Sequence, residues 1–331
     1  TANDTNDGDS GANDLLNFPI VTKVVQNGAN LDVTLVLDVP AGNYRIELYQ
    51  NPAGIDATRY GEGQVFLGAL SITSAGGAQT YTGTLTGVTA TSITRISATA
   101  TRDLGAGSYG STSEFGPRAG LVVSTTADTI DGTTTSVAAL ISNPGADGQI
   151  SLREAITAAN ATAGADTIYF DITAALAGGV HTITLAYDGA DAGTTPDALP
   201  TITSPVVING WTEPDYTGNP VIELNGNNVS GGVRGLVLGA GSDGSTIRGL
   251  TINRFSGTGI DITGSNNHTL QGNWIGLNAA GTAAAANGGK GIYASNSSGH
   301  LIGGTTAATR NVISGNAEQG IGFDNVDNST I

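Results

Sequence analysis

The chain has 331 residues, of which 28 are acidic and 12 are basic, so its formal net charge is −16 with neutral histidines. Nucleic-acid binding requires a basic surface that neutralises phosphates, and this composition argues against it. The lack of cysteine excludes disulfides, thiol nucleophiles and thiolate metal ligands. No apolar run approaches the roughly 20 residues that cross a bilayer. Glycine supplies 50 residues and charged side chains only 12%, which disfavours long surface helices and indicates a β protein.

Residues 1–16 form an acidic, polar segment with few apolar side chains. Such a segment cannot bury a core, so we interpret it as a linker or junction. Its side-chain oxygens surround Gly8 and suit a calcium ion bound with weak affinity, on the order of 0.1–1 mM. A solvated acidic linker without calcium is the open alternative. The candidate ligands are Asp4, Asn6, Asp7 and Asp9.

Residues 17–118 carry short runs in which apolar and polar side chains alternate. The apolar residues from Leu31 to Leu37 fall on one face at a period of two, and the run that begins at Tyr44 repeats the pattern. Further runs follow at about ten-residue spacing, separated by turns rich in glycine, asparagine and proline. We therefore predict an antiparallel, immunoglobulin-like β-sandwich over 17–118.

The clearest helix signal lies in the third region, 119–331. Ser151 and Glu154 form a capping box, in which the serine accepts a backbone N–H and the glutamate reaches back to the cap. An apolar stripe follows, and Asn160 supplies a stop signal, so we predict a helix over 151–160. We expect only short strands after this helix.

The segment 143–154 matches part of a twelve-residue calcium loop. Asn143 occupies the first position, Asp147 the fifth and Glu154 the twelfth, with a glycine at the sixth position for the turn. The third position is Gly145, which offers no side-chain ligand, and the capping box already explains Glu154. Two interpretations of this segment therefore remain: a calcium-binding loop, or a helix cap that binds no ion.

The segment 233–331 consists of repeats. Each repeat begins with glycine and a strand, turns at residues rich in Asn, Ser and Gly, and continues with further short strands. Three short strands per repeat, with aliphatic residues that stack on those of the next repeat, are typical of a parallel β-helix. The chain stops within a coil at Ile331, so we expect further coils or another subunit to cover this uncapped end. The repeats begin at Gly235, Gly259, Gly291 and Gly320.

Residues 147–156, Asp-Gly-Gln-Ile-Ser-Leu-Arg-Glu-Ala-Ile, resemble the Ser-Leu-Arg-Glu-Ala motif of large bacterial cell-surface and secreted proteins. The phrase Asn-Val-Ile-Ser-Gly-Asn at 311–316 and the run at 44–49 are similar to the same family. The resemblance implies a right-handed parallel β-helix preceded by an immunoglobulin-like β-sandwich in an extracellular protein of many modules. Ile150 departs from the pattern, because such proteins often have cysteine there. The family implies no reaction, since β-helices occur in enzymes and in inert stalks.

A glycan-cleaving β-helix needs carboxylates that converge at about 5–10 Å, which requires a shared outward column on neighbouring coils. The outward column of the first strand in each repeat contains a single acid, Asp261, and the column of the second strand, which includes Arg248, contains none. We therefore predict that the chain is not an enzyme.

Aromatic side chains suggest a platform on which sugars stack. Trp274 and Tyr293 are the best pair, and Trp211 and Tyr216 are further candidates. Scattered aromatic residues in β proteins usually pack into the structure, so this alternative stays open.

The histidines offer a weaker signal. His268 and His300 occupy equivalent places before their strands, whereas His181 lies apart. A metal site at the first two needs a third ligand, and none is evident. We expect both to be turn residues with hydrogen-bond partners.

Three functions fit these features. The first is a structural or adhesive module, a rigid rod that presents loops or assembles end to end on the bacterial cell surface. Its partners are neighbouring modules, copies of itself, glycans or a host surface, and Ca²⁺ is the one candidate cofactor. The second is a filament or surface-layer subunit stabilised by calcium, and the third is a polysaccharide lyase or hydrolase. We predict the first, because the side chains suit stacking better than catalysis.

Overall fold

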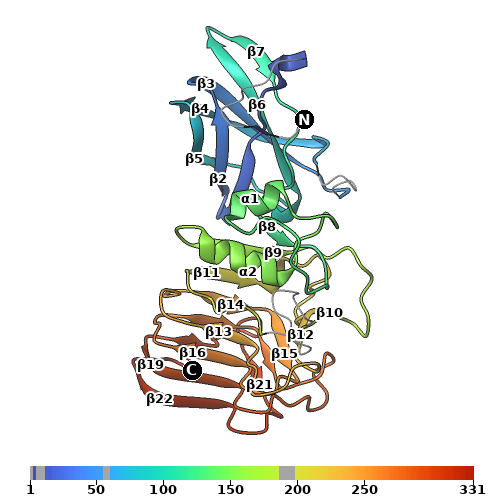
Figure 1. Cartoon of the computed structure of the whole chain (residues 1–331), viewed down its shortest axis with the longest axis vertical. Helices are drawn as coiled ribbons and strands as arrows, with labels where there is room; N and C mark the ends of the chain where they lie inside the picture. Colours follow the sequence, from blue (N-terminus) through green and yellow to red (C-terminus); the bar gives the residue numbers. More distant parts are fainter. Residues whose placement is uncertain (1–2, 5–11, 55–59, 186–197) are drawn as a thin grey trace. The chain divides into compact units, whose positions relative to one another are not determined.

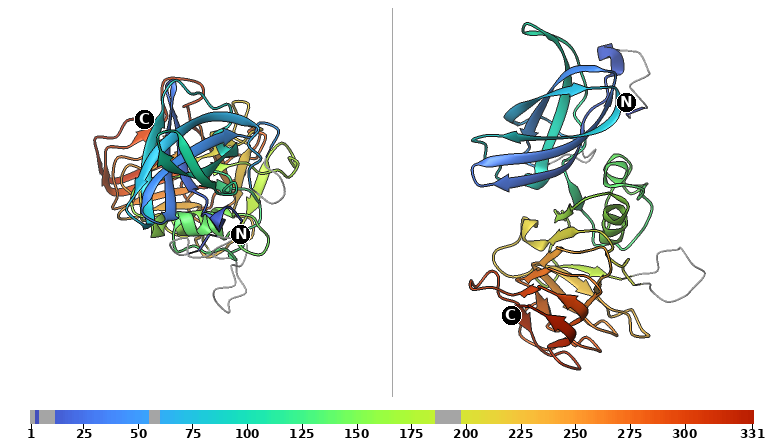
Figure 2. Two further views of the ribbon diagram at one scale, coloured as in Figure 1. Left: turned by 90° about the horizontal axis from the view of Figure 1, so that it is seen from above. Right: turned by 90° about the vertical axis from the view of Figure 1, so that its left-hand side faces the viewer.

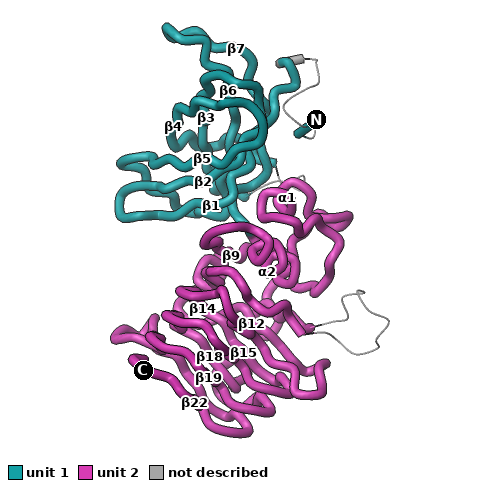
Figure 3. Tube along the Cα trace, turned by 60° about the vertical axis from the view of Figure 1, so that its left-hand side comes forward, with its two compact units in different colours: residues 1–121 teal, residues 122–331 magenta. Residues whose placement is uncertain are grey.

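A computed structural model of the chain describes residues 3–4, 12–54, 60–185 and 198–331. The structure is 42% strand and 8% helix and contains antiparallel and parallel sheets, which confirms the prediction of a β protein (Figure 1). No helix in the described part of the chain is long and apolar enough to cross a bilayer. The chain divides into two compact units, unit 1 (Thr1–Leu121) and unit 2 (Val122–Ile331) (Figure 3).

Unit 1 consists of two antiparallel sheets. The three-stranded sheet has the order β1-β2-β5, and the four-stranded sheet has the order β4-β3-β6-β7. The first sheet contains β1 (Ile20–Asn27), β2 (Asn30–Val39) and β5 (Gly77–Leu85). The second contains β3 (Gly42–Gln50), β4 (Val65–Ser74), β6 (Ile96–Gly105) and β7 (Ser108–Thr112). Two short 3-10 helices are η1 (Ala12–Leu15) and η2 (Ile93–Arg95).

One apolar core joins the two sheets of unit 1. Every second residue of β2 from Leu31 to Val39 is buried, as the period of two predicts. Ile46 and Leu48 of β3 lie in the same core. Tyr44 is buried beside them, and its hydroxyl donates a hydrogen bond to the carbonyl of Pro40 at 3.0 Å. This bond satisfies the one polar atom of the ring and fixes the turn before β3.

Unit 2 contains three parallel sheets, which the chain visits in turn. Sheet A has the order β13-β16-β19-β22, sheet B the order β20-β17-β14-β11-β9-β8, and sheet C the order β10-β12-β15-β18-β21. The consecutive strands β13, β14 and β15 belong to sheets A, B and C, and β16, β17 and β18 return to them in the same order. We call each such passage a coil. The views in Figures 1 and 2 show the strands of successive coils stacked on one another.

The strands of unit 2 are short, between two and seven residues. Sheet A contains β13 (Leu236–Leu238), β16 (Ile260–Thr263), β19 (Ile292–Ser298) and β22 (Ile321–Asp327). Sheet B contains β8 (Leu121–Val123), β9 (Asp166–Phe170), β11 (Val206–Asn209), β14 (Thr246–Arg248), β17 (Thr269–Gln271) and β20 (Leu301–Ile302). Sheet C contains β10 (His181–Thr184), β12 (Ile222–Asn225), β15 (Leu250–Asn253), β18 (Trp274–Ile275) and β21 (Val312–Ile313).

The glycines that begin the repeats lie where neighbouring coils approach each other closely. The N–H groups of Leu236 and Ile260 donate to the carbonyls of Gly259 and Gly291 at 3.0 and 2.9 Å. A Cβ atom on Gly235 would lie 2.4 Å from the carbonyl oxygen of Gly259, and one on Gly259 would lie 2.8 Å from that of Gly291. Any side chain at these positions would separate the coils, and Gly291 is equally constrained, which explains the glycine at the start of the first three repeats.

Buried asparagines fasten the coils at their corners. Asn273 is fully buried, and its Oδ1 accepts the N–H of Leu250 at 3.1 Å while its Nδ2 donates to the carbonyl of Ile247 at 2.9 Å. Its own N–H donates to Oδ1 of Asn311 in the following coil at 2.9 Å. Asn287 makes an equivalent set of bonds at another corner. These side chains satisfy backbone groups that the turns leave unpaired.

The predicted helix over 151–160 is confirmed as α2 (Leu152–Ala161). Ser151 and Glu154 form the expected capping box, and the helix ends at Ala161, with Thr162 as its C-cap, rather than at Asn160. The buried side chains of α2 face the first strands of unit 2, and the helix lies across that end of the stack (Figures 1 and 3). A second helix, α1 (Val137–Ser142), was not predicted.

Candidate functional site

The arginine of the Ser-Leu-Arg-Glu-Ala motif forms a buried ion pair. Nε and Nη2 of Arg153 donate to the two carboxylate oxygens of Asp128 at 2.9 and 2.6 Å, and both side chains are at most 2% exposed. Nη1 donates to the carbonyl of Ala198 at 2.6 Å. A bidentate pair of this kind is strong and fixes both partners in orientation. The arginine therefore holds α2 to the preceding and following segments.

Both carboxylate oxygens of Glu154, the glutamate of the motif, accept hydrogen bonds from backbone N–H groups. Oε2 of Glu154 accepts the N–H of Ser151 at 2.8 Å, which completes the capping box. Oε1 accepts the N–H groups of Asp131 and Gly132 at 2.9 and 2.8 Å. The side chain is buried, so capping and loop anchoring account for its role.

The other predicted ligands of the 143–154 loop have separate partners. Nδ2 of Asn143 donates to the hydroxyl of Thr133 at 2.8 Å. Oδ1 of Asp147 accepts the N–H of Gln149 at 2.7 Å, and Asp147 is exposed. These contacts explain the local conformation without an ion, and calcium binding by this loop stays a prediction.

Asp4 is the one predicted ligand of the opening segment that falls within the described residues. Its backbone N–H donates to Oδ1 of Asn17 at 3.0 Å, and its carbonyl accepts from Nδ2 of the same asparagine at 2.8 Å. Asn3 exchanges a similar pair of hydrogen bonds with the backbone of Phe18. These contacts fasten part of 1–16 to the sheets of unit 1, which the interpretation as a linker did not include. The other candidates, Asn6, Asp7 and Asp9, lie outside the described residues.

The outward column of the first strands, predicted to contain a single acid, forms on sheet A, and this acid is buried. Asp261 is 2% exposed, and its carboxylate lies 3.3 Å from Nε of Arg234 and accepts the hydroxyl of Thr263 at 2.8 Å. The column pairs Val237, Asp261, Tyr293 and Gly322, in the predicted register.

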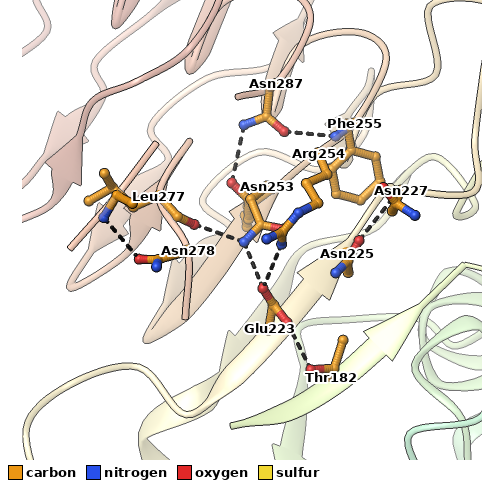
Figure 4. Close-up of polar contacts among 12 residues, drawn as sticks. Thr182, Glu223, Asn225, Asn227, Asn253, Arg254, Phe255, Leu277, Asn278 and Asn287 are labelled. Atoms are coloured by element: carbon orange, nitrogen blue, oxygen red, sulfur yellow. Dashed lines mark hydrogen bonds and ion pairs between the residues drawn. The ribbon is translucent and has the colours of Figure 1, made fainter. Parts of the chain in front are cut away.

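A second buried carboxylate, which the sequence analysis missed, joins three coils on sheet C. Oε1 of Glu223 accepts from Nδ2 of Asn253 at 2.7 Å and from Nη1 of Arg254 at 3.2 Å (Figure 4). Oε2 accepts the hydroxyl of Thr182 at 2.8 Å. Because these partners come from β10 and from the end of β15, the carboxylate of β12 ties its own coil to both neighbours. Asn253 also donates to the carbonyl of Leu277 at 2.8 Å, so the segment after β18 covers the group.

The predicted aromatic platform is not assembled on one sheet. Trp274 belongs to β18 of sheet C, whereas Tyr293 belongs to β19 of sheet A. Trp211 and Tyr216 do approach each other, with ring centroids 6.3 Å apart. The guanidinium of Arg248 lies 4.6 Å above the ring of Trp211, which places a cation–π contact on one of its faces.

His268 and His300 stack on neighbouring coils, with ring centroids 5.4 Å apart and planes at 4°. Nε2 of each ring lies within hydrogen-bond distance of a serine hydroxyl, Ser265 at 2.9 Å and Ser297 at 3.0 Å. This confirms the expectation of turn residues with hydrogen-bond partners. Burial, with the adjacent His300, lowers the pKa of His268 to about 4, so the imidazole is neutral near pH 7.

His181 lies in a cluster that the sequence analysis missed. Its Nε2 is 3.3 Å from Oδ2 of Asp215 and 3.7 Å from Oε1 of Glu213, and these three atoms lie within 4.8 Å of one another. His181 begins β10, whereas Glu213 follows η3 (Gly210–Thr212) and Asp215 lies in the turn after it. Among the described residues, this is the one group of three such side chains with the spacing of metal ligands.

The environment of this cluster is acidic and largely buried. The side chains of His181 and Glu213 are 1% exposed, whereas that of Asp215 is 49% exposed. Burial, together with the nearby carboxylates of Asp171 and Asp215, raises the pKa of Glu213 to about 7. Within the described part of the chain, no lysine or arginine forms an ion pair with Glu213 or Asp215. The sequence signal was weak, since two acids one residue apart in a turn are common.

Comparisons with known proteins identify no family for this chain. No protein-family model matches it, and no curated protein matches it. One solved structure, the catalytic domain of a GH87 alpha-1,3-glucanase variant in complex with tetrasaccharides, aligns at 12% sequence identity and a TM-score of 0.17. The alignment covers 92% of this chain and 67% of that chain. A likeness at this level carries no argument about fold or function.

Proposed function

We propose that the chain is a structural or adhesive module of an extracellular bacterial surface protein. In this proposal unit 2 is a right-handed parallel β-helix that serves as a rigid rod, and unit 1 is an immunoglobulin-like sandwich. The cyclic passage through three parallel sheets supports the first assignment, and the shared core of two antiparallel sheets supports the second. The resemblance of the 147–156 motif to bacterial surface proteins supports the location.

The observation that carries the proposal is the use of Glu223 as a fastener between coils. A catalytic carboxylate must reach its substrate, whereas Glu223 is buried and both its carboxylate oxygens accept hydrogen bonds from neighbouring coils. Asp261 is covered in the same way, and the buried asparagines and histidines also bond within the stack. The polar side chains of the coils thus contribute cohesion, which a rod that transmits force requires.

The proposed partners follow from the same architecture. Coils that expose short turns offer loops to a neighbouring module, to another copy of the chain, or to glycans on a cell surface. The net charge of −16 favours contact with basic or calcium-bridged surfaces over acidic ones. Calcium at the acidic opening segment would stiffen a junction between modules.

A turnover assay separates this function from that of a polysaccharide lyase or hydrolase. We expect the purified chain, incubated with a panel of acidic and neutral polysaccharides, to release no new reducing ends and no unsaturated products. Products that form with the wild type and are lost in Asp261→Ala would overturn the proposal. The same panel on a glycan array tests adhesion, and retention that survives Trp274→Ala would exclude that side chain as the platform.

A further inference from the structure

We propose that His181, Glu213 and Asp215 form a binding site for one Zn²⁺ ion. This site shares no residue with the contacts of Glu223 on which the proposed rod function rests. The inference therefore stands or falls independently of that function.

The two distances from Nε2 of His181 to the carboxylate oxygens match those between ligands of a tetrahedral zinc ion. Zinc lies about 2.0–2.2 Å from nitrogen and oxygen ligands, so two ligands at the tetrahedral angle are about 3.4 Å apart. Nε2 of His181 is 3.3 and 3.7 Å from the two carboxylate oxygens. Direct hydrogen bonds between charged groups are usually shorter, about 2.7–2.9 Å. The spacing therefore suits an ion between the three groups better than a direct bond.

The ligand types favour zinc over calcium. Calcium takes six to eight oxygen ligands, whereas an imidazole nitrogen with two carboxylates is a set that suits zinc. Three protein ligands leave a fourth position for water. Asp215, at 49% exposure, marks the side from which the ion and this water reach the site.

The negative charges of the two carboxylates in the cluster also favour a bound cation. Glu213 is 1% exposed, and its Oε2 accepts the N–H of Ile172 at 3.0 Å, whereas its Oε1 lies 3.7 Å from Nε2 of His181. Buried charge is costly unless it is paired or coordinates a metal. A divalent ion would supply the opposite charge that lysine and arginine do not supply among the described residues.

The position of the site gives the ion a structural consequence. His181 begins β10, whereas Glu213 and Asp215 lie between β11 and β12, in the following coil. His181 is paired in register with Ile222 of β12, so the two coils are already neighbours. A bound ion would cross-link these coils, and we expect zinc to raise the unfolding temperature.

The test uses the full chain without a histidine tag, loaded with Zn²⁺, dialysed and analysed for metal content. We expect one zinc ion per chain, and we expect Asp215→Asn and Glu213→Gln each to weaken binding at least about tenfold. Asp215 is half exposed, so its variant should fold, which circular dichroism checks. Asp327→Asn, an exposed acid elsewhere in unit 2, is the matched control and should leave zinc binding unchanged.

Cobalt substitution supplies a second readout, because tetrahedral Co²⁺ bound through nitrogen and oxygen absorbs visible light more strongly than hydrated Co²⁺. We expect this absorption in the wild type and in Asp327→Asn, and its loss in Asp215→Asn. A chain that retains no zinc would overturn the proposal and leave a hydrogen bond between His181 and Asp215. Zinc retained equally by all variants, or calcium bound at these residues in place of zinc, would also overturn it.

Discussion

Arg153→Met is expected to lower the free energy of unfolding by about 3–5 kcal/mol, because it removes the guanidinium that forms an ion pair with the buried carboxylate of Asp128. Arg153 and Asp128 are at most 2% exposed, and two hydrogen bonds join them. Methionine retains much of the apolar volume of arginine, so the loss measures the charge pair more than a cavity. Urea denaturation followed by circular dichroism gives the change in stability.

Two further variants test whether the loss of stability comes from the charge pair between Arg153 and Asp128. Arg310→Met removes an exposed arginine of unit 2 and should change stability by no more than about 0.5 kcal/mol. Arg153→Met combined with Asp128→Asn removes both charges, and its cost should be less than the sum of the two single costs. An effect of Arg153→Met as small as that of Arg310→Met would contradict a structural role for the motif arginine.

Acidification should destabilise unit 2 through His268, by up to about 3 kcal/mol. The pKa of His268 is about 4 in the folded chain, against 6.5 for an ordinary histidine. Because the folded pKa lies below the unfolded one, the unfolded state binds the proton more readily. The contribution is therefore fully present above pH 6.5 and is lost as the pH falls from 6.5 towards 4. Burial also lowers the pKa of the stacked His300, which adds in the same direction.

The variant His268→Ser isolates this contribution from the titration of carboxylates. Serine occupies the equivalent corner in the preceding coil, at Ser245, where it accepts the N–H of Val206 at 3.0 Å. Unfolding free energies measured at several pH values should fall less steeply between pH 6.5 and 4 in the variant than in the wild type. Equal slopes would mean that His268 is not held neutral by its buried environment.

Local signals in the sequence predicted much of the fold. Alternation from Leu31 to Leu37 predicted the strand β2, and the capping box at Ser151 predicted α2. The repeat that begins at Gly235 predicted parallel strands in register, since only glycine tolerates the close approach of the next coil. These features are encoded by neighbouring residues. Helix α1 was missed because its six residues are too few for a helical period to emerge.

The functional groups of the chain depend on contacts between distant residues. Asp128 lies 25 residues before Arg153, and Glu223 lies 30 residues before Asn253. Only the stacking of the coils brings such side chains together. The cluster at His181 depends on the same stacking, with its carboxylates more than thirty residues away. Sequence analysis could therefore propose metal ligands only in the two acidic segments, where several side-chain oxygens are close together along the chain.

The central claim is that polar side chains of unit 2 hold successive coils together, and a double-mutant cycle on Glu223 and Asn253 tests it most directly. The unfolding free energy is measured for the wild type, Glu223→Ala, Asn253→Ala and the double variant. A second cycle pairs Glu223→Ala with Asn228→Ala, an exposed asparagine that should show no coupling. The account predicts a coupling of about 1 kcal/mol or more in the first cycle. Additive effects within about 0.3 kcal/mol would contradict it.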